Sequence, residues 1–263
     1  MDFGIKGRVA VITGASKGMG NAIATGLAAE GAHVCIVARD PETLTAAAEA
    51  IRGGTGADVM TIPGDVADES FARRIVDQTL AKWGRLDIVV NNAGGPPPGT
   101  FLELPESAWQ QALNVNFLSA VRLTKLAVPI MKSKRWGRII SLTSTLAKEP
   151  SPDLILSGSA RAALSSFSKA ISIELAGDNI TVNTVCPGSV LTGRAESLLQ
   201  RAAEAEKISF EKILARSQAD IPIGRFAMPD EIADLVVFLA SERGSYVTGA
   251  TLTADGGLSK GLF

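Results

Sequence analysis

The stretch that decides the fold lies near the amino terminus, where Val9-Ala10-Val11-Ile12 runs directly into Thr13-Gly14-Ala15-Ser16-Lys17-Gly18-Met19-Gly20. The first four residues predict a buried strand, and the residues from Asn21 to Glu30 predict a helix. Glycines between them allow a tight turn and let backbone N–H groups approach a pyrophosphate at the helix amino terminus. A glycine cluster alone proves little, but one placed between a strand and a helix predicts a dinucleotide-binding site.

Short β-branched runs continue to alternate with longer helical patterns along the chain. Continuous apolar runs are typical of strands that are covered on both faces of a parallel sheet. Repeated strand–helix–strand units predict an α/β Rossmann fold, with a doubly wound parallel sheet of about seven strands and helices on both faces. The later strands are expected at Val34 to Val37, Val59 to Ile62, Ile88 to Val90, Arg138 to Leu142, Thr181 to Val185 and Thr251 to Ala254.

No linker, repeat or low-complexity tract divides the chain, so residues 1–263 are expected to form a single dinucleotide-binding and catalytic domain. The main irregular insertion runs from about Leu191 to Phe226 and is rich in charge. Its apolar residues predict one or two amphipathic helices, which form either a plain surface pair or a lid over a substrate cleft. A position after the carboxyl end of a strand favours the lid. These apolar residues are Leu198, Leu199, Ala202 and Ile208.

Composition excludes several classes of function. Hydrophobic residues make up 46% and the formal net charge is −1, which predicts a large core and gives no electrostatic basis for binding nucleic acid or a membrane. No apolar run approaches the roughly 18 residues that span a bilayer, and the first residues do not resemble a signal peptide, so we expect a cytoplasmic protein. The two cysteines, Cys35 and Cys186, are interpreted as buried inert thiols, and no metal site is predicted.

The glycine spacing, T-G-x-x-x-G-x-G, resembles that of the short-chain dehydrogenase/reductase family. Further motifs of that family follow in order: Asp65-Val66, Asn91-Asn92-Ala93-Gly94, Val115-Asn116, Pro187-Gly188-Ser189-Val190-Leu191-Thr192 and Asp255-Gly256-Gly257. The resemblance implies a nicotinamide dinucleotide as cofactor. The residues that it implies for cofactor binding are Gly14, Ser16, Lys17, Gly18, Met19, Gly20, Arg39, Asp65, Val66, Asn92, Ala93, Gly94, Arg161, Pro187, Gly188, Val190 and Thr192.

The end of the second predicted strand indicates which nicotinamide cofactor binds. An acidic residue there bonds the ribose 2′-OH of NAD, whereas a basic residue accommodates the 2′-phosphate of NADP. By the resemblance, Ala38 stands where the acid would be and Arg39 where the base would be. Lys17 adds a second cation, so we expect NADP(H) to be favoured over NAD(H). The alternative is that both cations are ordinary solvated charges and that Asp40 serves as an acceptor for NAD.

The catalytic residues implied by the resemblance are only partly present. The family uses Asn, Ser, Tyr and Lys, and here Asn116 and Ser144 match the first two. In the Tyr-x-x-x-Lys motif, however, Ser157 stands at the tyrosine and Arg161 at the lysine. The only tyrosine of the chain is Tyr246, and the only histidine is His33. Both lie outside the region that the resemblance assigns to the nicotinamide.

This substitution changes the expected chemistry. Ser157 could position a carbonyl but would donate a proton poorly, while Arg161 could hold ribose hydroxyls and stabilise a developing alkoxide. Four residues apart on a helix, both side chains could face one cleft, and a water chain anchored by Asn116 could supply the proton. Alternatively, Ser157 or Ser159 is a helix cap and Arg161 a surface residue. A third interpretation replaces the missing acid by Lys148, Glu149 or Asp153.

Together these observations predict an NADP(H)-dependent oxidoreductase that interconverts a carbonyl and a secondary alcohol and resembles the 3-oxoacyl-acyl-carrier-protein reductase branch. One alternative is an NADP(H)-binding sensor or scaffold without hydride chemistry, which the missing tyrosine motivates. Another is an isomerase or dehydratase on the same fold. The expected substrate is a small carbonyl or alcohol. The resemblance also implies a homo-oligomer, either a tetramer or a dimer, and the apolar tail residues Leu258, Leu262 and Phe263 agree with it.

Overall fold

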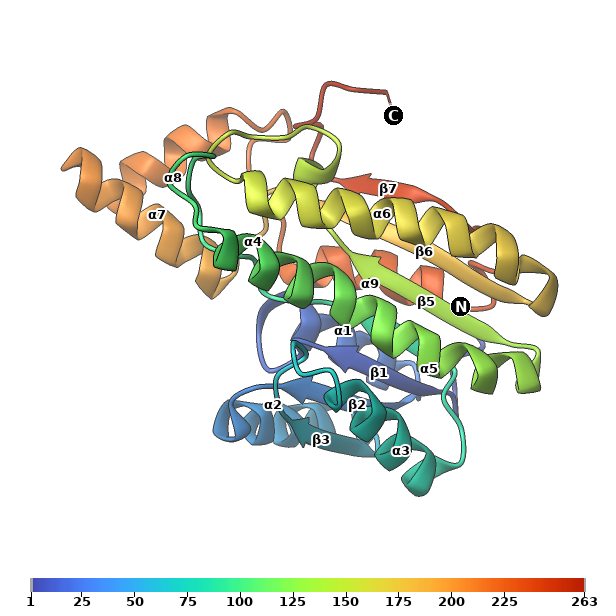
Figure 1. Ribbon diagram of the computed structural model, residues 1–263. Helices are drawn as coiled ribbons and strands as arrows, with labels where there is room; N and C mark the ends of the chain where they lie inside the picture. Colours follow the sequence, from blue (N-terminus) through green and yellow to red (C-terminus); the bar gives the residue numbers. More distant parts are fainter. Residues whose placement is uncertain (1, 263) are drawn as a thin grey trace.

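Seven parallel strands form one sheet in the order β3-β2-β1-β4-β5-β6-β7 (Figure 1). The computed structural model describes residues 2–262. The predicted α/β fold and all seven predicted strands are confirmed, with ends that differ by a residue or two. The strands are β1 Val9–Thr13, β2 His33–Ala38, β3 Val59–Pro63, β4 Ile88–Asn91, β5 Gly137–Leu142, β6 Ile180–Pro187 and β7 Thr251–Ala254.

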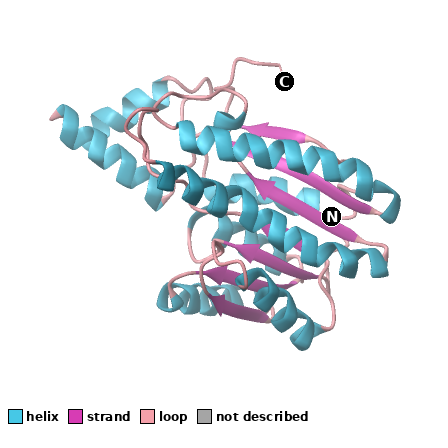
Figure 2. Cartoon of the chain, viewed as in Figure 1, coloured by secondary structure: helices cyan, strands magenta, loops and turns pink. Residues whose placement is uncertain are grey.

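Helices cover both faces of this sheet (Figure 2). Successive side chains of a strand point to opposite faces, so Ile12 enters the apolar cluster beneath α1, α2 and α9, and Val11 enters the one beneath α3, α5 and α6. Within residues 2–262, no helix has both the length and the apolar character that crossing a membrane requires. The helices are α1 Gly18–Ala29, α2 Pro41–Thr55, α3 Phe71–Trp83, α4 Glu106–Leu113, α5 Ser119–Lys134, α6 Ile155–Leu175, α7 Gly193–Glu206, α8 Phe210–Ala219 and α9 Pro229–Ala240.

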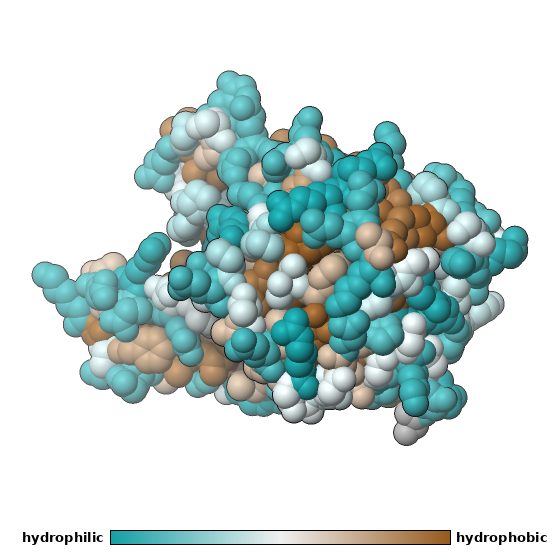
Figure 3. All heavy atoms as spheres, turned by 90° about the horizontal axis from the view of Figure 1, so that it is seen from below, coloured by the Kyte–Doolittle hydropathy of each residue, from teal (hydrophilic) through white to brown (hydrophobic). Residues whose placement is uncertain are grey.

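The strand order reverses between β1 and β4, which are neighbours in the sheet. In doubly wound sheets, ligands bind in the crevice that this reversal opens at the carboxyl ends of the strands. The strands are parallel, so their carboxyl ends share one edge of the sheet, which lies on the left in Figure 1, and α7 and α8 project beyond this edge. The space-filling view shows a hollow on the same left side, between two projecting parts of the molecule (Figure 3).

The predicted helical insertion forms a two-helix hairpin, α7 and α8, that has a small apolar cluster of its own. Leu199, Ala203 and Ile213 are buried in this cluster, and Ala202 and Ile208 pack against it. Leu198, which the sequence pattern placed with them, is 38% exposed and points away from the cluster. The amphipathic helices are therefore confirmed, with one residue assigned to the wrong face.

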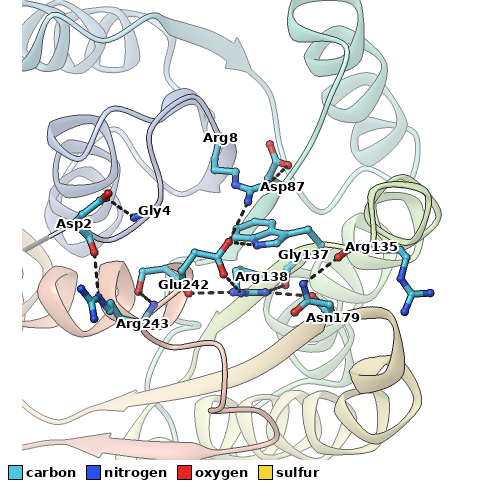
Figure 4. Close-up of polar contacts among 12 residues, drawn as sticks. Asp2, Gly4, Arg8, Asp87, Arg135, Gly137, Arg138, Asn179, Glu242 and Arg243 are labelled. Atoms are coloured by element: carbon cyan, nitrogen blue, oxygen red, sulfur yellow. Dashed lines mark hydrogen bonds and ion pairs between the residues drawn. The ribbon is translucent and has the colours of Figure 1, made fainter.

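The opposite edge of the sheet, at the amino ends of the strands, contains a buried arginine (Figure 4). The side chain of Arg138, on β5, is fully buried, and burial lowers its pKa. Its Nε donates to the Ser241 carbonyl at 3.2 Å, and its guanidinium lies 3.5 Å from the Glu242 carboxylate. The ring of Trp136 lies between the guanidinium groups of Arg138 and Arg8, whose Cζ atoms are 4.3 Å and 3.7 Å from its centroid. This network ties β5 to the segment after α9.

We predict that Arg138→Ala lowers the free energy of unfolding by about 3 kcal/mol, because it leaves buried carbonyl groups without donors. Arg73→Ala removes an exposed arginine of α3 and should change the stability by less than about 0.5 kcal/mol. Urea denaturation of both variants measures the difference. A loss below about 1 kcal/mol for Arg138→Ala would show that the network adds little to stability.

Candidate active site

The turn between β1 and α1 is built to receive a phosphate group. Gly14 and Gly18 have φ values of 61° and 59°, the left-handed region that favours glycine. A Cβ atom on Gly20 would overlap the carbonyl oxygen of Gly14. The cap residue of α1, Lys17, makes no side-chain hydrogen bond to the helix, so the first N–H groups of α1 remain available to an anion.

Asn92 supports this turn from the neighbouring strand. Its Nδ2 donates to the carbonyl oxygens of Thr13 and Gly14, both at 3.1 Å. The Thr13 hydroxyl donates to the Asn92 carbonyl at 2.8 Å and accepts from the Asn92 N–H at 2.9 Å. The Asn92 amide is thus engaged in holding the turn, and Thr13 joins the site although it was not among the predicted cofactor residues. Ser16 and Met19 lie in the same turn, and Ala93 and Gly94 follow Asn92.

The carboxyl end of β2 supplies positive charge. Arg39 and Lys17 are exposed there. The neighbouring Asp40 caps α2: its Oδ1 accepts from the Thr43 N–H at 2.7 Å, and this bond and the proximity of Lys17 lower the pKa of Asp40. One oxygen of this carboxylate is therefore engaged by the helix, while Oδ2 makes no hydrogen bond within residues 2–262.

Two more predicted cofactor segments follow β3 and β6. Asp65 is exposed after β3 and accepts from the Ala67 N–H at 2.9 Å, while Val66 packs against the core. After β6, a Cβ atom on Gly188 would stand 2.6 Å from the Cβ of Asp255, so this position requires glycine. Both segments therefore lie at the carboxyl edge of the sheet, as predicted.

The segment from Pro187 also connects the sheet to the α7–α8 hairpin. Val190 is buried and pairs with Ala227 in an isolated parallel bridge. Thr192 caps α7 by accepting from the Ala195 N–H at 3.3 Å, and its methyl group lies 3.4 Å from where a Cβ of Gly18 would stand. The first turn of α7 therefore lies directly beside the glycine-rich turn.

Asn116 lies in a π-helix, Asn114–Leu118, that separates α4 from α5. Such a wide turn is rare in proteins and is frequent at functional sites. Asn116 is buried, its Nδ2 donates to the Ala112 carbonyl at 3.2 Å, and its Oδ1 has no hydrogen-bond partner. A buried acceptor without a donor is costly, so this oxygen is a candidate for contact with water or a ligand.

Ser157 and Arg161 lie on one face of α6, as their spacing predicts, and the Arg161 Nε donates to the Ser157 Oγ at 3.1 Å. The helix begins at Ile155 and its cap residue is Leu154, so the interpretation of Ser157 or Ser159 as a cap is wrong.

The guanidinium of Arg161 reaches the carboxyl edge of the sheet. Its Nη1 donates to the carbonyl oxygens of Leu142 and Thr143 at 3.2 Å and 2.6 Å, and its Nη2 lies 3.5 Å from that of Ala93. Arg161 therefore joins α6 to the ends of β4 and β5 and is not a free surface residue. Burial, with a contribution from the nearby Arg194, lowers the pKa of Arg161 to about 10. The group is still protonated at neutral pH.

Ser144 is held close to this pair. It caps a short 3-10 helix, Thr145–Ala147, and its Oγ accepts from the Leu146 N–H at 3.2 Å. The first turn of α6 packs on this 3-10 helix so tightly that a Cβ on Gly158 would stand 3.1 Å from the Leu146 carbonyl oxygen. The structure thus places Ser144 and Ser157 on elements that are in contact.

The side chains that could replace a missing acid are mostly engaged elsewhere. The Lys148 Nζ donates to the Thr251 carbonyl and the Thr253 hydroxyl at 3.1 Å and 3.0 Å. The Glu149 carboxylate accepts from the Lys260 and Gly261 N–H groups at 2.7 Å and 2.8 Å and so fixes the tail. Asp153 is exposed, with no side-chain hydrogen bond among residues 2–262.

Neither a phenol nor an imidazole reaches the carboxyl edge. Tyr246 is fully exposed in the segment between α9 and β7. His33 begins β2 at the opposite edge and stacks on Trp83, with ring centroids 5.9 Å apart. Cys35 and Cys186 are buried free thiols, and burial raises the pKa of each.

Arg194, in the first turn of α7, was not predicted from the sequence. Its two terminal nitrogens donate to the carbonyl oxygens of Gly95 and Pro96, both at 2.9 Å. A Cβ on Gly95 would stand 2.8 Å from this guanidinium, so the glycine permits the contact. No local pattern distinguishes Arg194 from a solvated arginine, since its partners lie almost one hundred residues earlier.

Comparison with known proteins agrees with this geometry. A family model described as enoyl-(acyl carrier protein) reductase matches residues 14–259. The 3-oxoacyl-acyl-carrier-protein reductase of Thermotoga maritima is 34% identical over 257 residues, which cover 97% of this chain and 98% of that protein.

Solved structures give the same result. The L-sorbose reductase of Gluconobacter frateurii, in complex with NADPH and L-sorbose, superposes with a TM-score of 0.96 at 37% identity and full coverage of both chains. A single-residue variant of the actinorhodin polyketide ketoreductase with NADPH has a TM-score of 0.92 at 32% identity, and the match covers 97% of this chain and 98% of that one. The chain belongs to the short-chain dehydrogenase/reductase family, and the relatives named above are reductases.

Proposed function

We propose that the protein is an NADP(H)-dependent oxidoreductase that interconverts a carbonyl and a secondary alcohol, with Ser157 and Arg161 in the places of the family's tyrosine and lysine. The observation that carries this proposal is the Arg161–Ser157 hydrogen bond at the carboxyl ends of β4 and β5, on a helix that packs against the π-helix of Asn116 and the 3-10 helix that Ser144 caps. The cofactor cradle around Gly14 and Gly20 supports it, and so do relatives that were solved with NADPH.

The cradle fits a dinucleotide phosphate. The uncapped amino terminus of α1 supplies N–H donors for a pyrophosphate, and Arg39 with Lys17 supplies charge for a 2′-phosphate. When bound, NADPH supplies the hydride that the carbonyl carbon receives. Arg161 has one N–H without a partner within residues 2–262, and this N–H would donate to a ribose hydroxyl.

Ser157 acts as the hydrogen-bond donor to the substrate oxygen. Its Oγ accepts from Arg161, and a guanidinium has no acceptor, so the hydroxyl hydrogen must point elsewhere. No acceptor for it is found among residues 2–262. The hydroxyl hydrogen of Ser144 is also available to the substrate, because the Ser144 Oγ accepts from the Leu146 N–H. Two hydroxyl groups can therefore donate to one carbonyl oxygen, and the charge of Arg161 favours negative charge on that oxygen.

A serine hydroxyl is too weak an acid to give up its proton at neutral pH, so the proton comes from water. The buried Oδ1 of Asn116 has no partner and would hold such a water. Reduction then adds a hydride to the carbon and a proton from water to the oxygen, with release of hydroxide to solvent. The α7–α8 hairpin, which begins beside the glycine-rich turn at Thr192, would close over the substrate as a lid.

Self-association as a tetramer or dimer also remains a prediction of the resemblance. Leu113 and Leu118, which end α4 and the π-helix, are 39% and 38% exposed and support association through this region. Of the tail residues, Leu258 packs against the α7–α8 cluster, Leu262 is exposed and Phe263 lies outside the described residues.

For the cofactor, we predict that NADPH binds at least about tenfold more tightly than NADH, because each charge-assisted hydrogen bond to the 2′-phosphate contributes about 1.5–3 kcal/mol. Arg39→Ala should remove most of this preference and leave the affinity for NADH unchanged. Arg73→Ala is the control for loss of one positive charge. Fluorescence titration with both cofactors measures the affinities. Equal or tighter binding of NADH by the natural protein contradicts the prediction.

For the reaction, we predict that the protein oxidises NADPH with at least one compound in a panel of ketones, free oxo acids, 3-oxoacyl thioesters and quinones. Ser157→Ala should lower kcat/KM at least about tenfold, as loss of a donor to a developing oxyanion does. Arg161→Ala should lower it further, because Ser157 loses its orienting bond. Nicotinamide absorbance measures turnover, and the far-UV circular dichroism of each variant controls for folding.

The double variant Ser157→Tyr/Arg161→Lys distinguishes the alternatives. Turnover in this variant alone would mean that the pocket accepts carbonyls but that the natural site has lost hydride transfer. Tight NADPH binding without turnover in any variant would favour the sensor or scaffold.

A further inference from the structure

Two arginines, from two different helices, approach the same short loop, which follows β4. Arg161, from α6, has its Nη2 3.5 Å from the Ala93 carbonyl oxygen, and Arg194, from α7, donates to those of Gly95 and Pro96 at 2.9 Å. Their contacts are thus separated by only two or three residues of one loop. The lowered pKa of Arg161, to which Arg194 contributes, agrees with this proximity.

Within residues 2–262, neither Arg161 nor Arg194 has an acidic partner. All ion pairs within residues 2–262 involve other residues, and the contacts of Arg161 and Arg194 are to carbonyl or hydroxyl oxygens, which are neutral. The loop from Ala93 to Gly99 contains no acidic residue. Glu196 lies two residues after Arg194 on the same helix, and side chains with this spacing do not face each other. The Arg161 charge is removed from water, which normally requires an opposite charge nearby, whereas Arg194 is exposed and can bind a ligand from solvent.

The two arginines also keep unused donors. A guanidinium has five N–H groups; Arg161 uses four of them in the contacts described, and Arg194 uses two, which leaves one and three. Planar forks of this kind bind carboxylates with two parallel hydrogen bonds. The adenosine end of the cleft has its own cations, Lys17 and Arg39, so the 2′-phosphate does not need this second pair.

We infer that the substrate carries a carboxylate that Arg194 binds, so that the protein acts on free oxo acids or hydroxy acids and not on neutral ketones or acyl thioesters. This inference rests on the proposed function and specifies its substrate class. Arg194 is the principal contact, because it has three unused donors and stands on the hairpin that faces the cleft. The positive charge of Arg161, near the Ala93 carbonyl oxygen, adds a long-range attraction for the substrate carboxylate.

The binding of oxo acids to the protein–NADP⁺ complex tests this inference without turnover. Neither oxidised nicotinamide nor a ketone can supply a hydride, so no reaction takes place. The probes are acetoacetate, 2-oxobutanoate and levulinate, which differ in the spacing of carbonyl and carboxylate, each with its methyl ester. Isothermal titration calorimetry measures their affinities for the natural protein and for Arg194→Met. Arg201→Met is the matched control: it removes the same charge from the same helix, about 10 Å farther along the axis.

We expect at least one oxo acid to bind the natural protein at least about tenfold more tightly than its ester. Arg194→Met should remove this preference and change the affinities for the ester and for NADP⁺ less than about twofold, while Arg201→Met retains the preference. Three results would overturn the inference: equal binding of every acid and its ester, an unchanged preference in Arg194→Met, or a matching loss of NADP⁺ affinity. Failure of turnover alone would leave this binding result intact and would count only against the proposed reaction.

Discussion

The site depends on one guanidinium group. Arg161 crosses from α6 to the carboxyl ends of β4 and β5 and satisfies the carbonyl groups of Leu142 and Thr143, which parallel strands leave open at this edge. The same group fixes the Ser157 hydroxyl through its Nε. A lysine has a single donor nitrogen and could not make these contacts together. The geometry therefore links the stability of the sheet edge to the orientation of the group that would bind the substrate oxygen.

This arrangement differs from a catalytic pair in which the side chain next to the cation is itself an acid. Ser157 orients and donates a hydrogen bond, while the proton has to come from water near Asn116. Positive charge also gathers at the loop after β4, because Arg194 donates to the Gly95 and Pro96 carbonyl oxygens and forms no ion pair within residues 2–262. The inferred substrate carboxylate would supply the opposite charge and would favour closure of the hairpin on which Arg194 lies.

The fold and the cofactor cradle could be predicted from sequence because their signals are local. A strand that runs into Gly14, Gly18 and Gly20 specifies a turn within a dozen residues, and every predicted strand is present. The catalytic part of the site was harder to predict from the sequence, because its geometry depends on contacts between segments that are distant along the chain. The bond from Arg161 to Thr143, the engagement of Asp40 by α2 and the reach of Arg194 to Gly95 all depend on how elements pack.

The most direct test of the claim that water supplies the proton is the pH dependence of hydride transfer. The rate would be measured in a single turnover by stopped-flow absorbance, with NADPH and the best carbonyl substrate. Arg161 stays protonated and burial raises the pKa of Cys186, so neither of these groups changes charge near neutral pH. The account predicts a rate that varies less than about twofold between about pH 6 and about pH 9. A sigmoidal or bell-shaped profile with a pKa inside this range would contradict it, because a titrating side chain would then be the proton donor.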